Sequence, residues 1–229
     1  MNRKSRAWLP LIAAVGIVCT ALFIFGVIVD DVLLRRLVKP FPVLSMIAAV
    51  LLLRRTAYAK TIAAGLGLCV LGDIFLELPE RFFIFGMVAF LLGHVGYIVA
   101  FVRRNASSQP LAAIPFAVWI VWAGVTLMPH LGDLRLPVII YTIVIFVMMW
   151  RAASLVLGES EPSALDWLAM LGAASFGFSD TLIALDKFRE PIDGVRIPII
   201  MMYWVGQSLI AASALSHNAE DSTSEPDEA

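Results

Sequence analysis

Two aspartates, Asp73 and Asp180, lie inside long apolar stretches, within the segments 71–77 and 175–180. A charged carboxylate at such a depth in a membrane costs roughly 2.5–3.5 kcal/mol on insertion scales, so these residues usually face a bundle interior or a polar cavity. There they can transfer protons or bind ions. We therefore interpret both as candidate functional groups. The structural alternative is an ion pair or a polar contact that holds two helices together.

Polar side chains occur in two further apolar runs at helical spacing. His94 and Tyr97 are three residues apart, and Tyr203 and Gln207 are four apart. Residues three or four apart lie on the same helix face, so each pair can point into one cavity. The structural interpretation is a set of hydrogen bonds between helices. The functional interpretation is a polar site near the middle of a membrane.

Two charged residues lie near the ends of the apolar runs. Glu77 follows Asp73 by four residues and shares its helix face, although its position favours a solvated helix end. Lys39 precedes Pro40, and proline is typical of the first turn of a helix. The functional interpretation of Lys39 is a cation near the mouth of a cavity, placed to bind a phosphate group.

The composition is that of a membrane protein. Of the 229 residues, 60% are hydrophobic and 15% charged, with a mean hydropathy of +0.88, whereas soluble domains are roughly 45–50% apolar and 25% charged. The net charge of −1 argues against a nucleic-acid partner, which would need a basic surface. Cys19 and Cys69 lie in apolar runs and are interpreted as small buried residues. No metal or cofactor is predicted, although an Asp/His/Asp set can hold a metal.

The apolar runs predict an all-α, polytopic membrane protein of about eight transmembrane helices. Most runs are long enough for a hydrocarbon core of about 30 Å at ~1.5 Å per residue. The first run is longer than the apolar region of a cleaved signal peptide, so we predict a transmembrane helix there. The predicted spans are 7–29, 40–53, 61–78, 82–102, 111–128, 136–157, 164–185 and 197–215, with a polar link at 30–39 and a charged loop at 186–196.

The sequence predicts one membrane domain, residues 1–216, and a disordered acidic tail, residues 217–229. An even number of spans places both termini on one side. Basic residues are nearly balanced between the two sides. The amino-terminal cluster of Arg3, Lys4 and Arg6 and the arginine pairs at helix ends favour cytoplasmic termini.

An internal repeat is one further possibility. Gly72-Asp73 and Gly93-His94 in the first half match Ser179-Asp180 and Gly206-Gln207 in the second half, since a small residue precedes a polar one each time. Two four-helix halves running in the same sense would bring both aspartates toward the same membrane face. Chance similarity between helices rich in small residues is the alternative.

The same residues carry a resemblance to a known family. The matching motifs are Lys39-Pro40, Gly72-Asp73, Phe90-Leu-Leu-Gly-His94-Val-Gly-Tyr97, Gly172-Ala-Ala-Ser-Phe176, Ser179-Asp180, and Tyr203 with Gln207. In order and spacing they resemble the lysoplasmalogenase (YhhN-type) membrane proteins. The resemblance implies an eight-span enzyme that cleaves the vinyl ether bond of a lysoplasmalogen. The products would be a fatty aldehyde and glycerophosphoethanolamine or glycerophosphocholine, and the partners would be the lysophospholipid and membrane lipids.

Two carboxyl groups suit that chemistry, because paired carboxylates also serve the oxocarbenium-like transition state of glycosidases. In this hypothesis one of Asp73 and Asp180 is the acid and the other stabilises the cation, and the assignment between them stays open. His94 orients a carboxyl group or a water molecule. In the same hypothesis, hydrogen-bond or phosphate contacts to the substrate are expected from Lys39, Glu77, Tyr97, Tyr203 and Gln207.

Two other classes of protein compete with this enzyme: a small transporter or carrier with a polar midplane site, and a structural or lipid-scaffolding protein.

Overall fold

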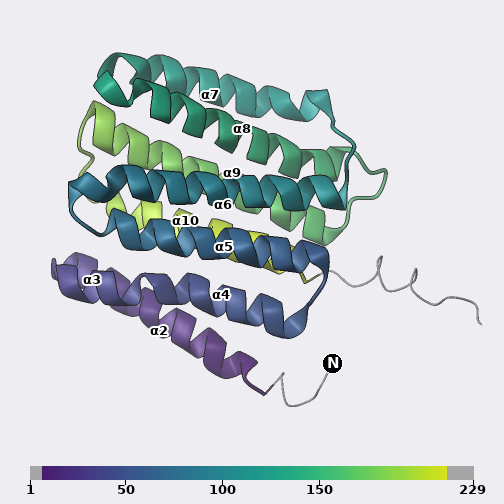
Figure 1. Ribbon diagram of the computed structural model, residues 1–229, viewed down its shortest axis with the longest axis horizontal. Coiled ribbons are helices and arrows are strands. Elements are labelled where there is room, and N and C mark those ends of the chain that lie inside the picture. The colour runs from purple at the N-terminus through teal and green to yellow at the C-terminus, as the bar shows by residue number, and fades with distance from the viewer. Residues whose placement is uncertain (1–6, 216–229) are drawn as a thin grey trace, which may run out of the picture.

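The computed structural model describes residues 7–215, and this part of the chain is a bundle of antiparallel helices without a strand (Figure 1). Short 3-10 or π turns join several of the helices, among them η1 (Glu80–Phe82) and the π turn η5 (Leu185–Arg189). The main helices are α2 (Leu9–Ile28), α3 (Val32–Val38), α4 (Pro40–Leu53), α5 (Ala57–Leu76), α6 (Phe83–Arg104), α7 (Ile114–Leu127), α8 (Arg135–Leu157), α9 (Ala164–Ala184) and α10 (Arg196–Ser213).

Seven helical segments in the described residues are long and apolar enough to cross a membrane. The polytopic helical fold is therefore confirmed. The predicted eighth span corresponds to α10, which is not among the seven. This helix has 18 residues, begins at Arg196 and carries Gln207, so it is one of the more polar helices. It nevertheless packs closely against α9 inside the bundle.

The predicted polar link at 30–39 is wrong over most of its length. Asp30 reverses the chain with a φ of 53°, and the side chain of Asp31 then accepts a hydrogen bond from the backbone N–H of Leu34 at 3.0 Å. Such a side-chain cap begins a helix, and α3 follows. Together α3 and α4 form one candidate span, residues 32–53, which lengthens what the sequence predicts as the shortest transmembrane helix.

Other boundaries shift because capping side chains decide where helices begin. α5 begins at Ala57, four residues before the predicted start, because the hydroxyl of Thr56 accepts from the backbone N–H of Ala59 at 3.1 Å. The predicted loop at 186–196 starts instead with the π turn η5. The predicted acidic tail and the basic amino-terminal cluster lie outside the described residues.

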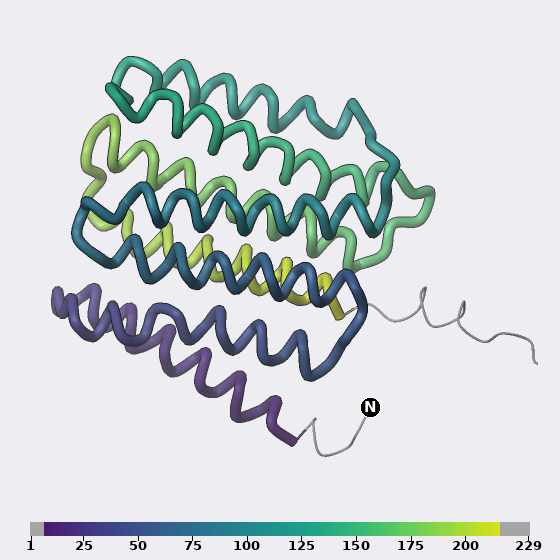
Figure 2. Tube along the Cα trace, viewed as in Figure 1, coloured from purple at the N-terminus to yellow at the C-terminus, as the bar shows by residue number. Residues whose placement is uncertain are grey.

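Two helix pairs, α5 with α6 and α9 with α10, form the centre of the bundle (Figure 1). Glycines permit their close approach: a Cβ on Gly65 would lie 3.1 Å from the carbonyl oxygen of Gly93, and one on Gly172 would lie 2.8 Å from that of Gly206. α4 and α2 flank this centre on one side, and α8 and α7 on the other. Figure 2 shows that α2 begins and α10 ends at the same end of the bundle.

Candidate active site

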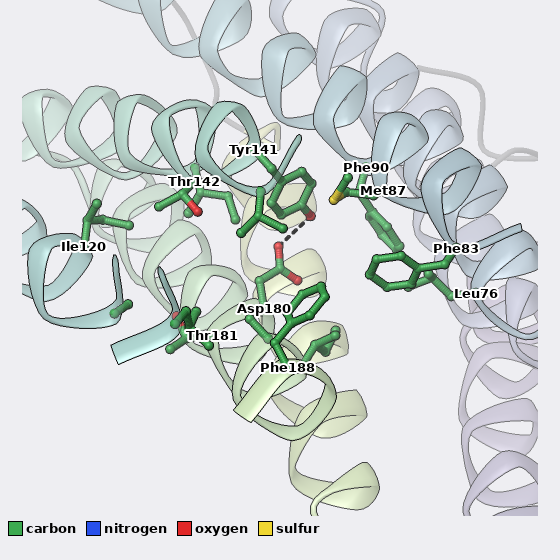
Figure 3. Close-up of a pocket in the computed structure, with 16 residues that line it drawn as sticks. Leu76, Phe83, Met87, Phe90, Ile120, Tyr141, Thr142, Asp180, Thr181 and Phe188 are labelled. Carbon is green, nitrogen blue, oxygen red and sulfur yellow. Dashed lines mark hydrogen bonds between the residues drawn. The ribbon is translucent and has the colours of Figure 1, made fainter. Parts of the chain in front are cut away.

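Asp180, near the carboxyl end of α9, lines a pocket with mostly apolar walls (Figure 3). The hydroxyl of Tyr141, on α8, donates a hydrogen bond to Asp180 Oδ2 at 2.7 Å. Within the described residues, no lysine or arginine forms an ion pair with this carboxyl group. The pocket thus presents one carboxyl group to an apolar ligand. Its walls include Phe83, Met87, Phe90, Leu127, Val138 and Phe188.

His94, on α6, lies beside this carboxyl group and is fully buried. Its Nε2 is 4.0 Å from Asp180 Oδ2, which is too long for a hydrogen bond. The ring stands edge-on to Phe176, with 4.5 Å between the ring centroids, and to Tyr141. Neither ring nitrogen has a hydrogen-bond partner within residues 7–215. Buried polar atoms are rarely left unpaired. We therefore expect each nitrogen to bind a water molecule or a polar atom of a ligand.

Asp73, near the carboxyl end of α5, has different neighbours. Its Oδ2 accepts a hydrogen bond from the hydroxyl of Tyr203, on α10, at 2.6 Å. The ammonium group of Lys39 lies 3.7 Å from Oδ1. All three side chains are buried. A cation at this distance favours the ionised form of a carboxyl group, so Asp73 and Asp180 differ in charge environment although both lie near the same end of the bundle.

Glu77, just beyond the end of α5, is buried with 8% of its surface exposed, so the solvated helix end is wrong. Its Oε1 and Oε2 accept hydrogen bonds from Arg196 at 2.6 and 2.7 Å, and Oε1 also accepts from Lys39 at 3.0 Å. The Nε of Arg35 is 4.0 Å from Oε2. Burial by itself raises the pKa of Glu77, but Lys39 and Arg196 together outweigh it and hold the pKa below its ordinary value.

Tyr97 and Gln207 bond to each other across α6 and α10. The hydroxyl of Tyr97 donates to Gln207 Oε1 at 2.6 Å, and the sulfur of Cys69 lies 3.7 Å from the same hydroxyl. The Nε2 of Gln207 has no hydrogen-bond partner within the described residues. Gln207 can therefore still donate hydrogen bonds to a ligand, whereas the hydroxyl hydrogen of Tyr97 is engaged.

The predicted residues thus fall into neighbouring groups rather than one cluster of contacts. Aromatic rings connect the groups. The ring of Phe176 lies 5.2 Å from that of Tyr203, which bonds Asp73, and 4.5 Å from that of His94, beside Asp180. Phe90 packs edge-on against both Phe176 and Tyr203 and also lines the pocket.

Three residues of these groups are missing from the sequence prediction: Tyr141, Arg35 and Arg196. Tyr141 is an aromatic residue in an apolar helix, so nothing in the sequence separates it from packing residues. From the sequence alone, both arginines enter only the count of basic residues that predicts the membrane orientation. The buried position of Arg35, with 7% of its surface exposed, is the property that distinguishes it from an arginine at a membrane interface.

No group of three or more His, Cys, Asp or Glu side chains in residues 7–215 is arranged to hold a metal ion. The site consists instead of carboxyl groups, hydroxyl groups and an imidazole at an apolar pocket inside a helical bundle. These features define a multi-pass helical membrane protein with a polar site within the membrane. The YhhN family model matches residues 34–214, and the chain belongs to this family.

Relatives with known names come from mammals and bacteria. The chain is 30% identical over 213 residues to lysoplasmalogenase TMEM86B of Mus musculus, covering 92% of this chain and 87% of the relative. It is 31% identical over 189 residues to lysoplasmalogenase TMEM86B of Sus scrofa, with 77% and 74% covered. It is 31% identical over 162 residues to a lysoplasmalogenase of Mycobacterium bovis, with 67% and 59% covered. No solved structure gives a significant match.

Proposed function

We propose that this protein hydrolyses the vinyl ether bond of lysoplasmalogens, releasing a fatty aldehyde and a glycerophospho headgroup. The names of its relatives support this function and favour an enzyme over a carrier or a scaffold. The observation that carries the proposal is the Asp180 carboxyl group, hydrogen-bonded by Tyr141 and set in an apolar pocket. An alkenyl chain fits such walls, and the acid-labile bond then lies beside the carboxyl group.

Vinyl ether hydrolysis begins with a proton. The acid protonates the β-carbon of the double bond, which turns the ether carbon into an oxocarbenium ion. A water molecule adds to this ion and loses a proton, forming a hemiacetal. The hemiacetal then collapses into the aldehyde and the glycerol hydroxyl. The proton that the water gives up restores the acid, so the step is balanced without a cofactor.

Asp180 is the acid in this proposal. An apolar wall without a cation favours the neutral form of a carboxyl group, whereas a nearby lysine favours the ionised form. Asp180 has the first environment, and Asp73, with Lys39 at 3.7 Å, has the second. Asp73 therefore takes the role of the ionised carboxylate that stabilises the cation. His94, whose ring nitrogens have no hydrogen-bond partner among residues 7–215, orients the water molecule.

The remaining candidate residues bind the substrate or position the groups that act on it. Gln207 donates a hydrogen bond through Nε2, which has no partner in the described part of the chain, and Tyr97 holds the amide in position. Tyr203 holds Asp73. Lys39 meets the phosphate, and Glu77 fixes Lys39 from the other side.

The test is aldehyde release from lysoplasmenylethanolamine by purified wild-type, Asp180→Asn and Asp73→Asn proteins, with the ester-linked lysolipid as substrate control. We expect both variants to lose at least a hundredfold in kcat, which is the usual contribution of acid–base catalysis. In D2O the wild-type product should carry deuterium at the carbon next to the aldehyde, because that carbon receives the proton. Near wild-type turnover in both variants would refute the mechanism.

The protein is an integral, multi-pass membrane protein, since seven described segments can span a membrane. We propose further that both termini face the cytoplasm. The Arg103 and Arg104 pair at the end of α6 supports this orientation, because cytoplasmic ends of membrane helices carry an excess of basic residues.

A further inference from the structure

Cationic side chains gather around Glu77 in excess of the acidic ones. Arg35, Lys39 and Arg196 reach its carboxylate, and the Nε of Arg36 donates to its backbone carbonyl at 2.8 Å. The anions that these cations contact are Glu77, Asp73 and Asp30. Four cations thus meet three carboxylates, and the side chain of Asp30 is 89% exposed to solvent.

The buried part of this cluster needs a further acceptor. Arg35 and Lys39 are each only 7% exposed, and burying a charge is costly unless it is paired and hydrogen-bonded. One guanidinium nitrogen of Arg35 bonds to Asp30 at 2.9 Å, but its Nε has no hydrogen-bond partner within residues 7–215. The buried carboxylates of Asp73 and Glu77 match the two buried cations in number, so the surplus charge lies on the exposed side of the cluster. This surplus and the free donor both favour an anion with several oxygens, and guanidinium groups match phosphate in geometry.

The cluster adjoins the apolar pocket. Leu76 lines the pocket, and the next residue, Glu77, holds the cations. The end of α5 thus contributes to both sites, with side chains that point about 100° apart. Phe90 also links them, because it lines the pocket and packs against Tyr203, whose hydroxyl bonds Asp73 of the cluster. A lipid whose chain occupies the pocket would place its polar end among the cations.

We infer that Arg35 and Arg196, together with Lys39, bind the phosphodiester group of the lysolipid substrate. Glu77 spaces the three cations and keeps them from repelling one another before the phosphate binds. The phosphate balances the surplus charge and accepts from the free Nε of Arg35. This inference rests on the proposed function, since it names the headgroup contact of the same substrate.

Binding to Asp180→Asn protein tests the inference without turnover. Two lipids are compared, lysoplasmenylethanolamine and the phosphate-free 1-alkenylglycerol with the same chain. The parent should prefer the phospholipid, and adding Arg196→Gln should lower that preference about tenfold, because one charge-assisted contact is lost. Arg35→Gln should do the same. Arg196→Gln keeps the test valid if Arg35→Gln fails to fold, because the side chain of Arg196 is 46% exposed.

The matched control is Lys187→Gln, which removes a cation from the same end of the bundle. Lys187 pairs with Glu80 at 2.8 Å and forms no ion pair with Glu77, Asp73 or Asp30 within the described residues, so its loss should leave the preference unchanged. The inference is overturned if the arginine variants keep the parent's preference or if Lys187→Gln lowers it instead.

Inorganic phosphate provides the second arm. It should displace the phospholipid from the parent but not from the arginine variants. If inorganic phosphate binds while the parent shows no preference between the two lipids, the cluster is a site for free phosphate. The assignment of the cluster to the lipid headgroup is then wrong. Wild-type protein that releases no aldehyde refutes the proposed function alone, because these binding measurements do not depend on catalysis.

Discussion

At the scale of single residues, Tyr141 decides how Asp180 can act. Its hydroxyl occupies Oδ2, so a proton on the carboxyl group sits on Oδ1. In the proposed mechanism the bond therefore orients the acid as well as holding it. This is a positioning role, because Tyr141 acts through Asp180.

Tyr141→Phe should lower kcat about tenfold and change KM little, because the pocket keeps its shape while the carboxyl group loses one hydrogen bond worth roughly 1.5 kcal/mol. Steady-state aldehyde release measures both constants. Tyr58→Phe is the matched control, since it removes the buried contact between Tyr58 and Ser213 at 2.9 Å, far from the pocket. A fall in kcat of equal size in both variants would contradict the role of Tyr141.

Glu77 makes stability depend on pH. Its folded pKa lies below its ordinary value, so its ionisation adds stability that is complete above the unfolded pKa of about 4.3. That stability is lost as the pH falls through the folded pKa. Thermal unfolding in detergent should therefore show a steep loss of stability below about pH 4.

Glu77→Gln should remove this acid-induced loss and destabilise the protein by about 3 kcal/mol at pH 7, because the cations of a buried pair are left without their partner. Glu80→Gln serves as the control, since the Glu80 side chain is 85% exposed. It should follow the wild-type curve. Parallel curves for wild-type and Glu77→Gln would show that the ion cluster does not stabilise the fold.

The sequence alone identifies the residues that are out of place in an apolar span. Asp73, Asp180 and His94 are of this kind, and the structure buries Asp73 and His94 and places Asp180 at the wall of the pocket. The sequence alone does not identify partners that meet only when the helices pack together. Arg196 contacts Glu77 across 119 residues of chain, and no local pattern encodes such a distance.

At the scale of helices, glycine decides how closely the central pairs approach. Gly65 faces α6, where a Cβ would lie 2.6 Å from the ring of Tyr97, whereas a Cβ on Gly67 would meet nothing within 4 Å. Both glycines belong to α5. They therefore form a natural pair for comparing the same substitution in two environments.

Gly65→Ala should destabilise the protein by about 1–3 kcal/mol, the usual effect of overpacking. Gly67→Ala should be neutral or slightly stabilising, because alanine favours helices over glycine. Thermal unfolding of both variants in the same detergent gives the comparison. Equal effects would mean that the contact between α5 and α6 does not limit the substitution.

The two central pairs also bear on the internal repeat. Gly65 precedes Asp73 by eight residues, and Gly172 precedes Asp180 by the same number. α6 packs against α8 as α10 packs against α4. These matching contacts favour a repeat over chance.

At the scale of the whole molecule, the helices alternate in direction, so the connections lie at two opposite ends (Figures 1 and 2). The link between α6 and α7 lies at the end where α2 begins. The link between α9 and α10 lies at the other end, near the candidate site. Each end faces one side of the membrane.

Single cysteines at Ser107 and Asp193, both exposed, test this topology. With cytoplasmic termini, a membrane-impermeant maleimide added outside intact cells should label Asp193→Cys and spare Ser107→Cys until the cells are opened. The native Cys19 and Cys69 lie within helices, so unsubstituted protein measures the background. Labelling of both positions from outside would exclude the topology, and the reverse pattern would invert the orientation.

The unequal neighbours of the two aspartates bear on how such a protein arises. In a symmetric dimer of one four-helix unit, every substitution appears at both positions. Such a dimer holds two identical carboxyl groups and cannot make one an acid and the other its ionised partner. A single chain that carries both halves can place Lys39 beside one carboxyl group and Tyr141 beside the other, as this chain does. Different chemistry at the two aspartates therefore requires that both lie in one chain.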